Sequence, residues 1–98
     1  MSHRLGKEKF YLALLDLVAP GDIHSRVSSS LSQHLLHIKK DEDLPDAARN
    51  DYASFINSLN IDSSPGGHVT EIINSMSEVE VEKVAQKIVS LYEKVISG

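Results

Sequence analysis

The chain has 98 residues, a net charge of −4 and no cysteine, so it has one domain's length and neither disulfides nor cysteine-ligated zinc. Hydrophobic residues make up 41% of it, which is typical of globular rather than disordered proteins. No apolar run is long enough to span a membrane and no secretory signal is visible, so we expect a cytoplasmic protein. The acidic excess lies in residues 50–98, where it would repel phosphate groups, and it therefore disfavours nucleic-acid binding.

Hydrophobic residues recur at helical spacing throughout the chain, and no period-two alternation is sustained, so the sequence predicts an all-α protein. The first predicted helix covers about 6–18. It ends before Pro20 and Gly21, because proline disfavours a helical conformation of the residue before it. Its apolar stripe consists of Phe10, Leu14, Leu17 and Val18, widened by Tyr11 and Leu15.

Leu12 lies outside that stripe, on a side of the same helix that we expect to be polar in a small bundle. Either this helix is central and wrapped by the others, or another chain covers its second side. A domain of this size hardly surrounds a helix completely, and a two-fold homodimer is the commonest oligomer. We therefore predict a protein interface that includes Leu12, Tyr11 and Leu15.

The second predicted helix covers about 23–38, with Asp22 as its N-cap. Serines at positions 28, 29, 30 and 32 flank its apolar stripe. Because no nucleophile-elbow motif surrounds them, we interpret these serines as packed or solvated residues rather than nucleophiles. No other catalytic motif is visible in the sequence, so we expect that the protein is not an enzyme and needs no cofactor.

The segment from His34 to Asp43 is the strongest candidate for chemistry. His34 and His37 are three residues apart, so on a continuous helix they would be neighbours on one face, as two metal ligands are. Asp41 and Asp46 are acids that could help to complete such a site. These four residues are the metal candidates that the sequence offers.

The same segment also has a purely structural interpretation. Lys39 and Lys40 suit the C-terminus of a helix, where the carbonyl end of the dipole attracts cations. Asp43 and Pro45 suit the start of the next helix. In this interpretation His34 is a packing residue whose protonation weakens the fold, because charging an imidazole on a buried face is unfavourable.

Three further helices are predicted after this segment. One covers about 44–60, a loop with Pro65, Gly66 and Gly67 follows, and a short helix covers about 68–76. The last helix begins with a capping box at Ser77 and Glu80. The sequence thus predicts one domain over residues 1–98, an irregular bundle of four longer helices and one short helix.

For function we expect a non-catalytic protein-interaction module that binds a protein partner or itself, as a homodimer. The alternative is a metal-binding or small-ligand-binding helical protein that uses His34, His37 and the nearby acids.

Overall fold

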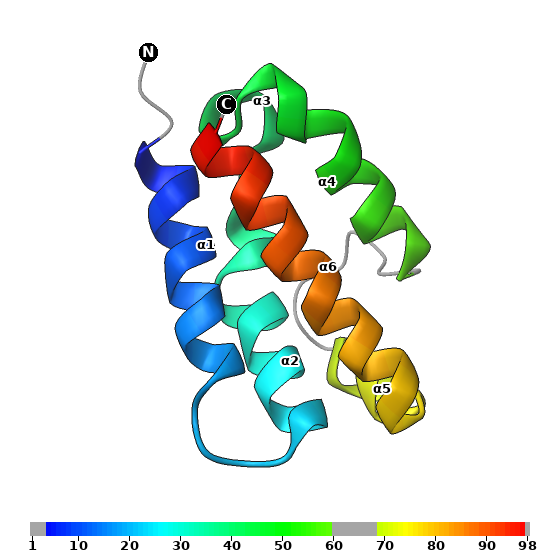
Figure 1. Cartoon of the computed structure of the whole chain (residues 1–98). Coiled ribbons are helices and arrows are strands. Elements are labelled where there is room, and N and C mark those ends of the chain that lie inside the picture. The colour runs from blue at the N-terminus through cyan, green and yellow to red at the C-terminus, as the bar shows by residue number, and fades with distance from the viewer. Residues whose placement is uncertain (1–3, 60–68, 98) are drawn as a thin grey trace.

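The computed structural model describes residues 4–59 and 69–97, and all regular structure within them is helical (Figure 1). The prediction of an all-α bundle is confirmed. In chain order the elements are α1 (Arg4–Leu17), α2 (Ile23–Gln33), the 3-10 helix η1 (Leu35–His37), α3 (Lys40–Asp43), α4 (Asp46–Ser58), α5 (Val69–Asn74) and α6 (Glu78–Ser97). None of the helices in these two ranges combines the length and the apolar character that crossing a membrane would require.

α6 is the longest helix and organises the bundle, since α1, α2 and α4 all pack against it. Figure 1 shows α6 crossing in front of α2, with α1 on one side and α4 on the other. The largest fully buried side chains come from α1, α2, η1, α5, α6 and the segment between α3 and α4: Phe10, Leu31, Leu35, Leu44, Ile73, Ile88 and Leu91. α4 adds the buried side chains of Ala48, Tyr52 and Phe55. The core therefore lies where the four longer helices converge.

Two helix starts follow the local sequence signals. The amide of Ser25 donates to Asp22 Oδ1 at 2.9 Å, which makes Asp22 the N-cap of α2. At the start of α6, the Glu80 amide donates to Ser77 Oγ at 3.2 Å and the Ser77 amide donates to Glu80 Oε1 at 2.9 Å. Both predicted caps are confirmed.

The prediction of one helix over 23–38 is wrong, because α2 ends at Gln33 and a 3-10 turn follows. In a continuous α-helix the Leu35 carbonyl would accept from the amide of Lys39. Here that carbonyl accepts from the hydroxyl of Tyr52 in α4, at 2.7 Å, and from the Ile38 amide of the 3-10 turn, at 3.2 Å. The Lys39 amide donates to the carboxylate of Asp43 at 2.9 Å. Side chains from outside the helix thus satisfy both backbone groups and allow the helix to end.

The expected places of the following charged residues change for the same reason. Lys39 is the N-cap residue of the short helix α3 rather than part of a helix C-terminus, and Asp43 is the last residue of α3. α4 begins at Asp46, two residues later than the predicted start at residue 44. The prediction of a loop at Pro65, Gly66 and Gly67 lies outside the described residues.

The buried side of α1 is turned relative to the predicted stripe. Gly6, Phe10 and Ala13 are buried. Val18, expected in the stripe, is exposed. Gly6 permits this rotation, because a Cβ atom there would lie only 2.0 Å from the backbone oxygen of Asp43. A glycine at this position allows α3 to lie directly against α1.

Candidate functional site

The two histidines that the sequence paired take different partners. His34 Nε2 lies 2.9 Å from Asp16 Oδ2 in α1, forming an ion pair when the ring is protonated. His37 Nε2 lies 3.0 Å from the carbonyl oxygen of Ser32, which can only accept, so this nitrogen carries the proton. Because α2 ends before His34, the two rings do not share one helical face. The sequence predicted a buried packing position for His34, but its ring also contacts the carboxylate of Asp16.

The acids proposed to complete a metal site serve the junction between α3 and α4. Asp46 pairs with Arg49, whose guanidinium also donates to the carbonyl oxygens of Leu44 and Asp41. The Asp41 residue is exposed to solvent. Within residues 4–59 and 69–97, no group of three or more His, Cys, Asp or Glu side chains could hold a metal ion.

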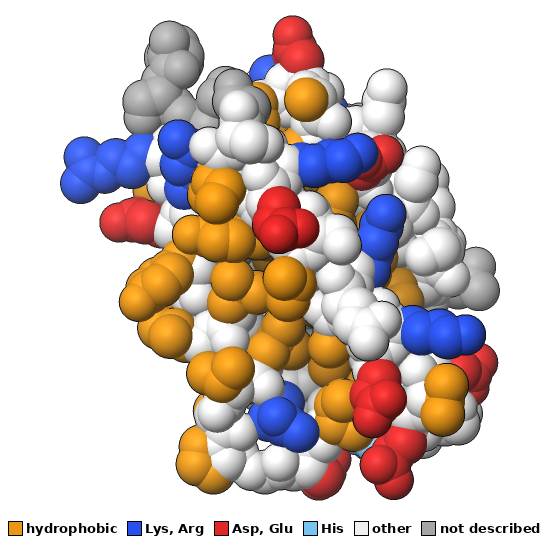
Figure 2. Space-filling model, in the orientation of Figure 1, with side chains coloured by type: hydrophobic (Ala, Val, Ile, Leu, Met, Phe, Trp, Pro, Cys, Tyr) orange, Lys and Arg blue, Asp and Glu red, His pale blue; other side chains and the backbone are white. Residues whose placement is uncertain are grey.

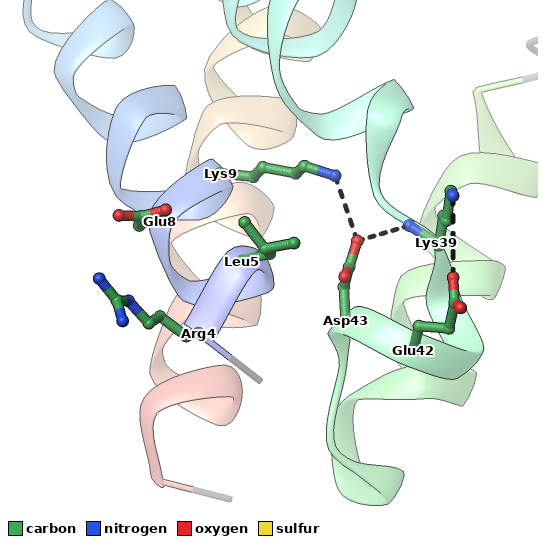
Figure 3. A pocket seen from close by; sticks show the side chains of 7 residues that line it. All are labelled: Arg4, Leu5, Glu8, Lys9, Lys39, Glu42 and Asp43. Carbon is green, nitrogen blue, oxygen red and sulfur yellow. Dashed lines mark hydrogen bonds and ion pairs between the residues drawn. The ribbon is translucent and has the colours of Figure 1, made fainter. Parts of the chain in front are cut away.

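Lys9 and Asp43 form a charged contact between α1 and α3 that the sequence did not single out. Asp43 is buried, and its Oδ2 accepts from the Lys39 amide at 2.9 Å and from Lys9 Nζ at 3.2 Å. Lys9 also donates to the carbonyl of His37 at 2.8 Å. Figure 3 shows Lys9 reaching from α1 across to Asp43, while Arg4 and Glu8 lie away from that pair. Lys9 thus connects α1 to the chain on both sides of residue 39.

These contacts determine how Asp43 and its neighbour Tyr52 ionise. Burial by itself raises the pKa of Asp43, but the hydrogen bonds from the Lys39 amide and from Lys9 outweigh it and lower the pKa below the usual 3.8. Burial, with a smaller effect of the Asp43 charge, raises the pKa of Tyr52 to about 12. Asp43 is therefore a stable carboxylate and Tyr52 a stable hydroxyl donor, which suits structural roles rather than proton transfer.

A surface pocket of about 660 Å³ opens beside this cluster. Three cationic and three acidic side chains and Leu5 line it: Arg4, Lys9, Lys39, Glu8, Glu42, Asp43 and Leu5. The formal charges cancel, and the carboxylate of Asp43 is already engaged by two donors. The pocket therefore selects neither an anion nor a cation by charge.

The serines of α2 are also structural. Ser30 is completely buried and Ser28 is 6% exposed, and neither hydroxyl has a hydrogen-bond partner among the described residues. Two side chains enclosed in this way are closed to a substrate. Their small size fits the close packing of α2 against its neighbours.

The most unusual surface feature is apolar and belongs to α1 and α6. On α1, Tyr11 is 53% exposed and Leu15 is 46% exposed, and Val18, directly after the helix, is 77% exposed. On α6, Val89 is 44% exposed and Ile96 is 49% exposed. Figure 2 shows a continuous area of hydrophobic side chains over α1 and the adjoining part of α6.

The contacts of α1 explain why its exposed residues face this way. Lys9 and Asp16 reach toward η1, α2 and α3. At about 100° per residue, Tyr11 and Val18 lie on the opposite side of the helix from these two. Leu15 lies between Tyr11 and Leu12, and Leu12 is 43% exposed at the outer border. From Tyr11 to Val18 the exposed side of α1 therefore carries no charge.

The contacts of α6 likewise explain which side of this helix its exposed apolar side chains occupy. Lys94 pairs with Asp51 of α4, and Lys87 lines a hollow shared with α4. Val89 and Ile96 lie about 150° from these lysines around the helix axis, on the side toward α1. We use the name α1–α6 apolar face for one surface, which Leu12 borders. It is formed by Tyr11, Leu14 and Leu15 of α1, by Val18 directly after α1, and by Ala85, Val89, Tyr92 and Ile96 of α6.

Of the residues that the sequence predicted for an interface, Tyr11 and Leu15 lie in this face and Leu12 lies at its border. Sequence reasoning missed the contribution of α6. The sequence feature that could have identified this contribution is the seven-residue spacing of Val89 and Ile96. It places both residues on one side of the last helix, away from the stripe that packs into the core.

Comparison of the chain with protein-family models, with curated proteins and with solved structures finds no match.

Proposed function

We propose that this chain is a non-catalytic protein-interaction module and that it binds protein through the α1–α6 apolar face. The observation that carries the proposal is the group of half-exposed apolar side chains on two adjoining helices, among them Tyr11, Leu15, Val18, Val89 and Ile96. The largest apolar patch of a monomer is typically about 300–600 Å² and is often functional. The footprint of this face is of that size: from Ala85 to Ile96 it extends about 17 Å along α6, and two helices are about 20 Å wide, which gives about 340 Å².

The chemistry of the face favours a protein partner. The centre of a protein interface is depleted in charge and enriched in aromatic residues, and this face presents Tyr11 and Tyr92 among aliphatic side chains. A nucleic acid would require a basic surface, whereas the chain carries a net charge of −4. Burying about 340 Å² on each partner removes about 680 Å² from water, which at 25 cal/mol per Å² gives about 17 kcal/mol before the association cost of about 4–15 kcal/mol. We therefore expect modest affinity.

Affinity capture from the native cell with three baits tests this proposal. We expect wild type to retain a protein, either another chain or an untagged copy of this one, and Leu15→Glu to lose it because a charge enters the face. Val79→Glu is the matched control, since Val79 is 60% exposed near the start of α6 and lies outside the face. Circular dichroism confirms that all three baits fold. Equal retention by all three, or no retention by wild type, would contradict the proposal.

The metal or small-ligand alternative at His34 and His37 lacks a supporting observation in the described part of the chain, where the two rings take separate partners. A thermal melt with added zinc tests it directly. A ligand that binds only the folded state at 100 times its Kd would add about 2.7 kcal/mol of stability.

A further inference from the structure

We propose that the occupant of the α1–α6 apolar face is a second copy of this chain, placed by a two-fold axis parallel to α1 so that Lys7 of each protomer meets Glu93 of the other. The inference rests on the proposed function, because it names the partner of the same face. It goes beyond that function by fixing the symmetry of the complex and one pair of charges.

The directions of the two helices provide the geometric basis. α1 and α6 pack against each other, and Figure 1 shows the start of α1 and the end of α6 at the same end of the molecule. A two-fold axis parallel to them places the partner's α1 over α6 and the partner's α6 over α1, at the same height. Each α1 then lies against two antiparallel α6 helices, one from its own chain and one from the partner. With Lys7 opposite the partner's Glu93, Tyr11 lies at the height of the partner's Val89 and Leu15 at the height of its Ala85, so the centre of the interface is apolar.

The charges at one end of the face fit this arrangement. Lys7 is exposed on α1 four residues before Tyr11, and so on the same side of the helix. Glu93 is exposed on α6, four residues after Val89 and three before Ile96. In the described part of the chain neither residue forms a salt bridge. Figure 2 shows charged side chains of both signs bordering the hydrophobic area at this end.

The charges also decide between a two-fold axis parallel to α1 and one perpendicular to it, both in the plane of the face. The axis parallel to α1 brings the N-terminal part of one α1 to the C-terminal part of the partner's α6, so Lys7 meets Glu93 twice by symmetry. The axis perpendicular to α1 would cross the two copies of α1 and bring Lys7 to the end that carries Val18. That arrangement pairs a cation with an apolar residue. Charge complementarity therefore selects the parallel axis.

The size of the face sets the expected strength of the dimer. A footprint of about 340 Å² per protomer lies below the roughly 800 Å² per partner of a stable standard interface. We therefore expect a reversible dimer with a Kd in the micromolar range. Sedimentation from about 1 to 200 μM should then follow the mass from that of the 10.8 kDa monomer toward the dimer.

Charge reversal tests the arrangement. Lys7→Glu and Glu93→Lys should each raise the Kd about tenfold, because two attractive contacts become repulsive. An equimolar mixture of the two variants should restore dimerisation close to that of wild type, since both contacts in the mixed dimer join opposite charges. Lys83→Glu makes the same charge change on the side of α6 that faces α4, and it should leave the Kd unchanged.

Each outcome supports or overturns the inference. Restoration in the mixture, together with a monomeric Leu15→Glu variant, supports it. A wild type that remains monomeric at about 200 μM overturns it, while capture of a different protein that Leu15→Glu loses would still uphold the proposed function. A dimer that resists Leu15→Glu, or a mixture as weak as the separate variants, overturns the proposed arrangement.

Discussion

The close approach of α1 and α3 makes Gly6→Ala a sensitive test of the fold. An added Cβ atom would lie 2.0 Å from the backbone oxygen of Asp43, whereas an ordinary carbon–oxygen contact is about 3.3 Å. One of the two helices must therefore move by more than about 1 Å, and Asp43 would lose its alignment with Lys9. Overpacking of this kind costs about 1–3 kcal/mol or more, and alanine regains up to about 1 kcal/mol of helix propensity. We expect a net loss of about 1–3 kcal/mol.

Urea denaturation followed by circular dichroism measures this loss. Glu8 provides the matched control, because it is exposed in the same helix and its side chain points away from Asp43 (Figure 3). At position 8 the alanine variant should be more stable than the glycine variant by about 1 kcal/mol. At position 6 the order should reverse. If alanine stabilises both positions, the tight contact between Gly6 and Asp43 does not exist in solution.

Three further changes probe other contacts. Ser77→Ala should lower the unfolding free energy by about 1 kcal/mol through loss of the cap of α6, and a thermal melt that matches wild type would contradict this. Tyr52→Phe removes the hydroxyl donor of the buried Leu35 carbonyl, which keeps the Ile38 amide, and should cost about 0.5–1.5 kcal/mol in urea denaturation. In wild type, an ultraviolet titration should show one tyrosine ionising near pH 12. Because folding lowers the pKa of Asp43 below the usual 3.8, its contribution to stability is present above that pH and is lost as the pH falls through the lower folded value. Asp43→Asn should therefore lose stability at neutral pH and show a shallower decline in acid, and an unchanged acid limb would refute this role.

The parts of the fold that were predictable from the sequence are those that depend on neighbours in the chain. The cap of α2 at Asp22 and the capping box at Ser77 and Glu80 each use residues three positions apart. Helical spacing of apolar residues likewise identified all four longer helices, since it depends only on the periodicity of the chain. Local physics therefore determines the class of the fold and several helix starts.

The end of α2 was not predictable in this way, because its cause lies far along the chain. The hydroxyl that donates to the Leu35 carbonyl belongs to Tyr52, seventeen residues later. The lysine that donates to Asp43 is Lys9, thirty-four residues before Asp43. No periodicity within residues 23–38 reports either contact. His34 and His37 do not share one helical face for the same reason, because the expected geometry required an uninterrupted helix.

The orientation of α1 depends on its neighbours as well as on its own sequence. Hydrophobic residues occupy so many positions of this helix that several faces have similar apolar content, and the sequence cannot rank them. Gly6 and Ala13 decide between the faces, because small residues allow close approach and so turn toward the bundle. Larger residues such as Tyr11 and Leu15 are then left outside. The excess of apolar residues that first indicated an interface is thus placed next to the exposed edge of α6, where one partner can cover both helices.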